Sequence, residues 1–422
     1  MRIAIIGSGI TGLGAAVALH GRPGKEVVLY EREQRAGGHA HTIDVAYDGQ
    51  PIAVDTGFIV YNELNYPNLT ALLRWAGVET IASDMSFSLS SDDGAFEWCG
   101  RHVSPLGGLF AQSRNALDPR FYGFLLGIRR FQMRALADHA AGAIGDETLA
   151  SYLDRIGCSA RVRDDYIVPM GAAIWSMTPG ETLAFPARSF FTFFNNHKLL
   201  QWDRPRWRTV KGGSRSYVAR LTDRLGSAVR TGATVATVRR DSGKVIVQSS
   251  IGDTATYDAV IFATHAPTAL SLLADADASE RAIIGAFRVS HNDVVVHRDP
   301  ALMPLRRRAW ASWNLLRRSG SDRAAVTYWM NPLQGLPERY PLFVTLNPDR
   351  LIRGEKVFAS FAYDHPLYDA AAIAAQGRLD SIQGRANVYF AGAWTGYGFH
   401  EDGLRSGLAA AQMLGGVAPW LR

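Results

Sequence analysis

Three glycines near the start of the chain have the spacing of a dinucleotide-binding turn. They are Gly7, Gly9 and Gly12, and they follow directly on a short apolar run. In such a turn the first glycine permits a tight bend, the second lets the backbone approach a pyrophosphate, and the third lets a helix pack closely on the strand. Unpaired amides at the start of that helix face the phosphates. The spacing therefore predicts a pyrophosphate site at this turn, which also includes Thr11.

An acidic residue stands where the ribose of a bound dinucleotide would lie. Glu31 follows a second apolar run, and its carboxylate can accept hydrogen bonds from both ribose hydroxyls. A carboxylate at this position disfavours the 2′-phosphate of NADP. The fingerprint alone leaves NAD and FAD open.

The elements that must position these residues open a doubly wound α/β sheet. Residues 2–6 read as a buried strand, residues 12–20 as a helix and residues 25–31 as a second strand. This order is typical of a Rossmann-type domain. We expect the chain to return to the sheet several times. The further strand-like runs are residues 233–239, 244–248, 259–263 and 387–391.

The residues after Glu31 indicate which of the two cofactors, NAD or FAD, the chain binds. Arg32 follows at once, and the glycine pair Gly37 and Gly38 precedes His39. This pattern resembles the flavin-containing amine oxidase and carotenoid desaturase superfamily, in which an acidic strand end, an arginine and a glycine pair wrap the pyrophosphate and the flavin. That superfamily usually has arginine where this chain has His39. The resemblance implies FAD as the cofactor.

Three motifs farther along the chain extend the resemblance. Gly57 and Phe58 belong to a segment that resembles the turn passing beside the flavin in that superfamily. Val235 lies on a run that resembles the strand whose backbone meets the adenine. Ala263 and Thr264 end a run that resembles the superfamily's Ala-Thr-Pro turn. The resemblance implies that all five residues contact the cofactor.

A last motif lies near the C-terminal end of the sequence. Gly392 resembles the glycine that lies against the pyrophosphate, although Ala393 follows it where most relatives have an acidic residue. A helix opening near Gly403 and Leu404 would direct amides at the pyrimidine carbonyl of the flavin and stabilise the charge of the reduced ring. Residues 394–403 contain no cysteine. The resemblance therefore implies FAD held without a covalent bond.

The order and spacing of these motifs predict an α/β fold with an α+β second domain. A Rossmann-type FAD-binding domain is assembled from the discontinuous segments 1–84, 207–290 and 384–422. A substrate-binding domain with a mixed sheet and helices takes residues 85–206 and 291–383.

Composition is that of an ordinary globular protein. Hydrophobic residues make up 47% and charged residues 20% of the 422 residues, which is enough apolar material for a large core. Cys99 and Cys158 fit neither a disulfide framework nor a metal site. His39 and His41 stand without further ligands, so we expect no metal. No apolar run is long enough to span a bilayer, and we expect a cytoplasmic protein without a nucleic-acid partner.

The segment expected beside the flavin offers the first catalytic candidates. His400 could accept a proton, and Tyr397 lies in the same motif. An alternative is that His400 only hydrogen-bonds the flavin or a neighbouring carbonyl. Glu401 and Asp402 are expected to cap the following helix and not to transfer protons.

Two further groups could wall a substrate pocket or fill the core. The run Phe190 to His197, read as a strand, would place rings on both faces, as in a buried strand or the wall of an apolar tunnel. The second group consists of aromatic and amide residues, for which the core interpretation is equally open. Its members are Trp310, Trp313, Asn314, Tyr328, Asn331 and Gln334.

Within the superfamily the shared chemistry is removal of a hydride from carbon by flavin. Residues 396–407 resemble small bacterial flavoproteins that include methyl-branched fatty-acyl desaturases of furan fatty acid formation. The resemblance implies an FAD-dependent oxidoreductase that desaturates a fatty-acyl chain of a lipid. Oxygen and a carrier both stay open as electron acceptor. The alternatives are an amine oxidase acting on a small amine or polyamine and a flavin-binding scaffold without activity.

The segment 119–139 has apolar residues at helical spacing, with Arg129, Arg130 and Arg134 between them. This pattern predicts an amphipathic helix. Its arginines could meet the phosphates of an anionic membrane while the apolar face enters the interface. We therefore expect peripheral contact at the inner face of the membrane, with an ordinary helix that covers the core as the alternative.

Overall fold

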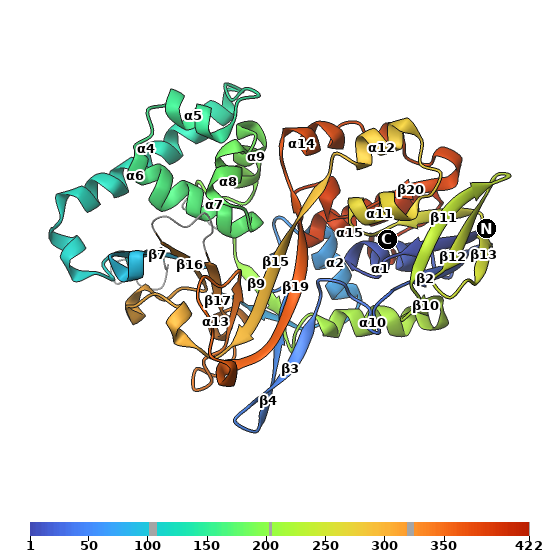
Figure 1. Cartoon of the computed structure of the whole chain (residues 1–422), viewed down its shortest axis with the longest axis horizontal. Coiled ribbons are helices and arrows are strands. Elements are labelled where there is room, and N and C mark those ends of the chain that lie inside the picture. Colours follow the sequence, from blue (N-terminus) through green and yellow to red (C-terminus); the bar gives the residue numbers. More distant parts are fainter. Residues whose placement is uncertain (101–107, 202–204, 319–324, 422) are drawn as a thin grey trace.

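The computed structural model describes residues 1–100, 108–201, 205–318 and 325–421. Figure 1 shows the two ends of an elongated molecule joined by two long strands, β15 (Arg288–His297) and β19 (Val357–Leu367). Within the described residues, no helix has the length and apolar character needed to cross a bilayer.

A five-stranded parallel sheet forms one end of the molecule. Its order is β10-β2-β1-β14-β20, and all four strand pairs are parallel. Its strands are β1 (Arg2–Ile6), β2 (Glu26–Tyr30), β10 (Val229–Arg230), β14 (Ala259–Phe262) and β20 (Val388–Phe390). The predicted Rossmann-type sheet is present, and the carboxyl ends of its strands meet at one edge. Such an edge is where α/β sheets bind ligands.

Two of the predicted strands belong elsewhere. Residues 233–239 and 244–248 were expected in the parallel sheet, but this prediction is wrong. They contribute to β11 (Val235–Asp241) and β12 (Lys244–Ser249), which form a separate antiparallel sheet with β13 (Thr254–Tyr257). Ser242 and Gly243 both have positive φ, which allows the tight turn of a hairpin. The run therefore pairs with its own continuation.

A seven-stranded mixed sheet forms the other end. Its order is β19-β15-β18-β17-β16-β7-β8, and the pair of β16 and β7 is the parallel one. The remaining strands are β7 (Phe87–Ser91), β8 (Phe96–Cys99), β16 (Trp313–Arg317), β17 (Ala325–Trp329) and β18 (Phe343–Leu346). This sheet confirms the predicted α+β character of the second part. Residues 101–107, 202–204 and 319–324 of that part lie outside the described residues, and the domain boundaries stay a prediction.

Helices α4 (Pro119–Ala140), α7 (Val168–Trp175) and α9 (Ala187–Asn196) accompany the mixed sheet (Figure 1). The amphipathic helix predicted at 119–139 is α4. Its first turn is capped by Asp118, whose side chain accepts from the backbone of Arg120. The expectation of a strand at Phe190 to Phe194 is wrong, because this run lies within α9. Phe190 and Phe194 stack one helical turn apart, with ring centroids 4.1 Å from each other.

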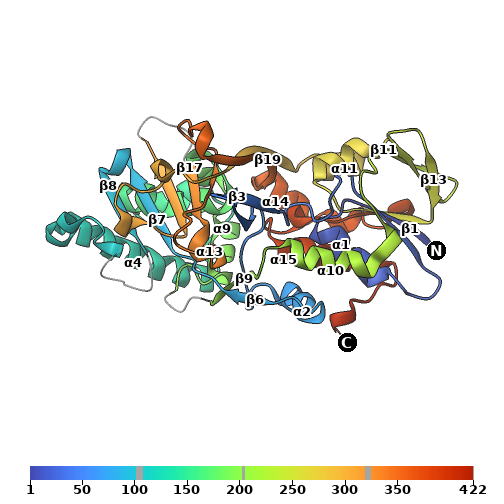
Figure 2. The same ribbon diagram turned by 90° about the horizontal axis from the view of Figure 1, so that it is seen from below.

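Three helices lie together next to the glycine turn that follows β1. They are α1 (Ile10–Leu19), α10 (Arg215–Leu225) and α15 (His400–Met413), and Figure 2 shows them side by side beneath the parallel sheet. Every residue of α1 is buried. Helix α2 (Pro67–Trp75) lies near the C-terminal end of the chain (Figure 2).

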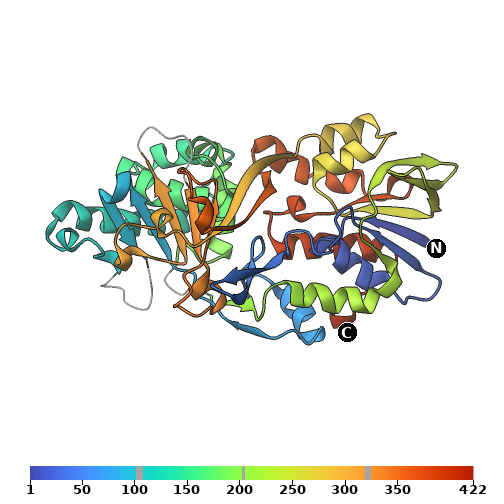
Figure 3. The ribbon, with the colours of Figure 1, turned by 60° about the horizontal axis from the view of Figure 1, so that its bottom comes forward.

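The buried carboxylate of Asp55 connects several segments between the two ends of the molecule by hydrogen bonds. Asp55 ends the hairpin of β3 (Thr42–Tyr47) and β4 (Gln50–Asp55), which Figure 3 shows between the two ends. It accepts from Ser214 N at 2.9 Å, from Thr42 Oγ1 at 2.6 Å and from Gln334 Nε2 at 2.7 Å. Burial raises the pKa of Asp55 to about 6. Three distant segments therefore meet at one side chain.

The smaller elements complete the fold. Strands β5 (Tyr61–Asn62), β9 (Trp207–Val210) and β6 (Thr80–Ala82) form a three-stranded sheet. The other α-helices of five or more residues are α5 (Leu149–Arg155), α8 (Pro179–Ala184), α11 (Ala266–Leu272), α12 (Ala278–Ile284), α13 (Met330–Gln334) and α14 (Ala370–Gln376), and α6 (Ala160–Val162) is a single turn.

Candidate cofactor and active site

A cavity of about 1320 Å³ joins the edge of the parallel sheet to aromatic residues of the second part. It is larger than the usual pocket for one small ligand. Most residues predicted for the site line it. These are Gly7, Gly9, Thr11, Glu31, Arg32, Gly38, His39, Gly57, Phe58, Val235, Ala263, Thr264, Gly392, Ala393, Tyr397 and His400. The remaining four, Gly12, Gly37, Gly403 and Leu404, lie behind this lining.

The glycine turn has the space that a pyrophosphate needs. A Cβ on Gly12 would lie 1.9 Å from the carbonyl oxygen of Gly7, so the helix approaches the strand closely there. A Cβ on Gly9 would meet no protein atom within 4 Å, because this position faces the cavity. No side chain caps the start of α1, which leaves that role to a ligand. The turn therefore fits a dinucleotide cofactor.

Glu31 is held at the cavity edge by its neighbours. Its Oε2 accepts from Ser8 N at 3.1 Å and from Ser8 Oγ at 2.6 Å, and its Oε1 accepts from Glu33 N at 2.9 Å. These bonds orient the carboxylate where the carboxyl ends of β1 and β2 meet. A carboxylate with two oxygens has lone pairs left for ribose hydroxyls.

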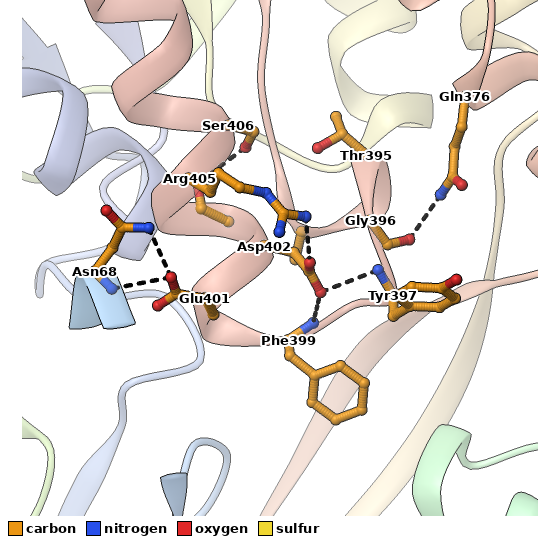
Figure 4. A network of polar contacts seen from close by, with 12 residues as sticks. Asn68, Gln376, Thr395, Gly396, Tyr397, Phe399, Glu401, Asp402, Arg405 and Ser406 are labelled. Carbon is orange, nitrogen blue, oxygen red and sulfur yellow. Dashed lines mark hydrogen bonds and ion pairs between the residues drawn. The ribbon is translucent and has the colours of Figure 1, made fainter. Parts of the chain in front are cut away.

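The C-terminal helix begins earlier than predicted. It was expected to open near Gly403, but α15 starts at His400. Asp402 is the reason, because its Oδ2 accepts from Tyr397 N at 3.0 Å and from Phe399 N at 3.2 Å (Figure 4). A Cβ on Gly403 would lie 2.7 Å from Thr11 Oγ1. Gly403 therefore permits close packing of α15 on α1.

Glu401 caps a helix other than the expected one. Its carboxylate accepts from Asn68 N and Leu69 N, each at 3.0 Å, at the first turn of α2. Figure 4 shows Asn68 also donating to Glu401 through its side chain, at 2.7 Å. Asp402 caps its own helix, α15, as predicted for both residues. Each carboxylate is thus committed to a helix terminus.

His400 lies in the cavity wall between two aromatic side chains. Its ring stacks on Phe58 with centroids 3.7 Å apart, and its Nε2 lies 3.0 Å from the hydroxyl of Tyr217. Burial lowers the pKa of His400 to about 3. Its Nε2 is thus already engaged by the Tyr217 hydroxyl, and one face of its ring is covered by Phe58. This geometry favours the alternative of a neutral hydrogen-bonding group.

Three imidazoles meet on one side of the cavity. The ring centroid of His39 lies 5.7 Å from that of His265 and 5.7 Å from that of His365. Burial and the neighbouring imidazoles lower the pKa of His39 and lower that of His365 to about 4. Within the described residues, His39 Nε2 has no hydrogen-bond partner, and no group of His, Cys, Asp and Glu could hold a metal.

His197, the last residue of the predicted aromatic run, lines the cavity, and its hydrogen-bonding role was not predicted from the sequence. It follows α9 and stacks on Phe193, with centroids 3.9 Å apart, and Phe193 in turn stacks on Phe399. His197 Nδ1 lies 3.1 Å from the carbonyl of Phe193, and because a carbonyl only accepts, Nδ1 carries the proton. The Nε2 of the neutral ring is then an acceptor. The four-residue spacing of Phe193 and His197 becomes informative once the run is a helix.

The aromatic and amide group divides between the cavity and the core. Trp313 and Tyr328 line the cavity and make an edge-to-face contact, with centroids 4.8 Å apart. Asn314 is buried, accepts a hydrogen bond from Ser88 and donates one to a backbone carbonyl. Asn331 also donates a hydrogen bond to a backbone carbonyl. Trp310 packs on Trp329, and Gln334 binds Asp55. The group therefore contributes two rings to the site.

Comparisons with known proteins agree with this arrangement. Residues 10–296 match the family model described as flavin containing amine oxidoreductase. Cyclohexylamine oxidase from Brevibacterium oxydans IH-35A is similar in structure, with TM-score 0.70, 17% identity, and 98% of this chain and 99% of that chain covered. Putrescine oxidase bound to putrescine has TM-score 0.71 and 15% identity, with 98% and 99% covered.

A structure from a different substrate class is also similar. The fatty acid isomerase from P. acnes has TM-score 0.65 and 15% identity, with 98% of each chain covered. No curated protein sequence matches the chain. Identities this low show the shared fold alone.

Proposed function

Because the chain belongs to the flavin-containing amine oxidoreductase family, it is an FAD-dependent oxidoreductase, and we propose that it desaturates a methyl-branched fatty-acyl chain of a lipid. The observation that carries this proposal is the apolar, aromatic lining of the cavity beyond the glycine turn. Most of its side chains come from the mixed sheet and from α7 and α9, and Met85 and Leu199 lie just outside these elements. The lining side chains include Met85, Phe87, Met170, Ile174, Trp175, Phe193, Leu199, Trp313 and Phe361.

Few acidic groups reach this part of the cavity. Among the described lining residues beyond Glu31 and Glu33, the one carboxylate is Asp364, which pairs with the exposed His291. An acyl chain has no charge to neutralise, whereas an alkylammonium ion does. The similar fatty acid isomerase acts, by its name, on a fatty acid.

The cofactor and the side chains of the protein have different roles in the proposed reaction. FAD, when bound, supplies the hydride acceptor. Loss of hydride from one carbon leaves positive charge there, which an alkyl branch stabilises, and the aromatic wall keeps water from that carbon. His197 Nε2 can take a proton from the adjacent carbon. The electrons of that C–H bond then complete the new double bond.

Anaerobic mixing of the yellow protein with candidate substrates tests the proposal. We expect methyl-branched acyl lipids to bleach the flavin absorbance and to lose two hydrogen atoms by mass spectrometry. Saturated straight-chain lipids are the matched control and should react more slowly. Bleaching by small amines, with an aldehyde as product, would contradict the proposal and assign the amine oxidase activity.

The identity of the base gives a separate prediction. His197→Phe keeps the stacking on Phe193 but removes the acceptor nitrogen, so flavin reduction should slow about a hundredfold, the usual lower effect of losing a positioned base. Bound FAD should be unchanged. His400→Gln is the comparison, with a smaller expected effect. A wild-type rate for His197→Phe with a large loss for His400→Gln would return the role to His400.

The amine oxidase alternative has one observation in its favour. Trp313 and Tyr328 offer aromatic faces to the cavity, and such faces attract cations. Two of the similar structures are amine oxidases by name. The net charge of +6 argues against a polycation as substrate.

A further inference from the structure

Helix α4 presents large apolar side chains to solvent. One face of the helix packs into the core through Phe121, Phe124 and Phe131. On the opposite face, Tyr122 is 45% exposed and Leu126 is 58% exposed. Met133, seven residues after Leu126 and therefore on the same face, is 56% exposed. The helix is thus apolar on two opposite sides.

Arginines flank this outer stripe. Arg129 lies on one side of the line through Leu126 and Met133, and Arg130 and Arg134 lie on the other, all three exposed. The one carboxylate of α4, Asp138, is buried and paired with Arg134. Helix α4 therefore carries Arg129 and Arg130 beside its outer apolar residues, while the charge of Arg134 is shared with Asp138.

A second surface helix shows that such a stripe is not a general property of the helices of this protein. The surface helix α10, in contrast, exposes Arg220, Asp223 and Arg224 and no large apolar side chain. An apolar face flanked by arginines is characteristic of helices that lie in a membrane interface.

We propose that the outer face of α4 is a docking surface for an anionic lipid bilayer. Its apolar stripe, defined as Tyr122, Leu126 and Met133, enters the interface between head groups and acyl chains. Arg129 and Arg130 contact lipid phosphates, an attraction that acts within a Debye length of the surface and weakens with salt. Charge complementarity selects this occupant, because the surface combines positive charge with apolar area.

The position of α4 connects this surface with the cavity. Phe131, on its inner face, packs against Phe191 of α9, with ring centroids 5.9 Å apart. Phe193 of the same helix lines the cavity. The outer face of α4 and the cavity therefore lie on opposite sides of the packed pair of helices α4 and α9. The proposal goes beyond the proposed reaction, since binding to a bilayer requires no particular substrate.

Co-sedimentation of the holoenzyme with vesicles tests the proposal. Vesicles of phosphatidylglycerol and phosphatidylcholine should bind the protein at low salt, and pure phosphatidylcholine vesicles should bind it less. Leu126→Gln with Met133→Gln should weaken binding at least about tenfold, because two buried apolar side chains are lost. Replacing Arg129 and Arg130 by glutamine should weaken it and flatten its dependence on salt, while Arg134 stays paired with Asp138.

A matched control separates this surface from apolar exposure in general. Ile251, between β12 and β13, and Met413, the last residue of α15, are also exposed, at 83% and 57%, and Figure 1 shows these elements at the other end of the molecule from α4. Replacing both by glutamine should leave vesicle binding unchanged, and all variants should keep FAD and their melting temperature.

Two results would overturn the proposal. The first is wild-type protein that ignores anionic vesicles at low salt. The second is a wild-type oligomer that the Leu126 and Met133 changes convert to a monomer, which would assign the face to a second copy of the chain. Failure of acyl lipids to bleach the flavin would instead count against the proposed reaction and leave vesicle binding intact.

Discussion

Gly9→Val should yield a folded protein that purifies without its yellow cofactor. The backbone at Gly9 has φ −63°, which any residue adopts, and an added Cβ meets no protein atom within 4 Å. The valine side chain therefore enters only the cavity, in the space expected for the pyrophosphate. We expect FAD affinity to fall by roughly a thousandfold or more, which corresponds to about 4 kcal/mol.

Absorbance at the flavin bands and the melting temperature of the purified protein check this result together. Gly180→Val is the matched control, because Gly180 is exposed and also has open space around its Cα. This variant should stay yellow. Gly12→Ala should behave differently and lose stability, since its Cβ collides with the Gly7 carbonyl. A Gly9→Val protein with full FAD content would place the pyrophosphate elsewhere.

The second large effect is a loss of stability in mild acid. Burial lowers the pKa of several histidines far below their usual value. These include His41, His197, His297 and His365, each with a pKa of about 4, and His400, with a pKa of about 3. In the unfolded chain they titrate near pH 6.5. Between pH 6.5 and about 4 the unfolded chain therefore binds more protons, and stability falls as the pH falls.

Buried carboxyls act in the opposite direction. The pKa of Asp55 is raised to about 6, so the folded chain binds this proton first and gains stability as the pH falls through that range. The histidines outnumber it. We expect the free energy of unfolding to fall by on the order of 5 kcal/mol between pH 7 and pH 4.5. Melting temperatures measured across this range would show it, and a flat profile would contradict it.

His297 provides the cleanest variant, because it lies outside the cavity lining. Its Nδ1 accepts from Asp299 N at 3.1 Å, and its Nε2 lies 2.7 Å from Thr345 Oγ1. This pattern requires the neutral ring. His297→Gln removes one titrating group and should reduce the steepness of the stability profile between pH 6.5 and 4. His20→Gln, at an exposed position, controls for the loss of an imidazole as such.

The sequence was sufficient for the parts of the fold that local motifs specify. The turn at Gly7 to Gly12, the parallel strands around it and the helix at 119–139 all follow from spacing and periodicity. The run at 233–248 was misplaced because an apolar run does not say which strand it pairs with. The run at Phe190 was misread because consecutive phenylalanines fit a strand as well as the buried side of a helix.

The candidate site could be predicted only where its residues belong to a motif. Glu31 and Gly392 were identified in this way, and both line the cavity. The meeting of His39 with His265 and His365 depends on segments hundreds of residues apart, so no local pattern reveals it. Likewise, the hydrogen bond that fixes the tautomer of His197 exists only once α9 has formed.

The order of strands in the parallel sheet bears on how the protein is made in the cell. β14 is paired with β1 from the first strand of the chain and with β20 from near its end, and α15 then packs on α1. During translation, the surroundings that bury α1 are incomplete until residues near 410 have left the ribosome. A nascent chain with such exposed surface is prone to aggregate. We therefore expect dependence on chaperones during synthesis and loading of FAD only after α15 has been synthesised.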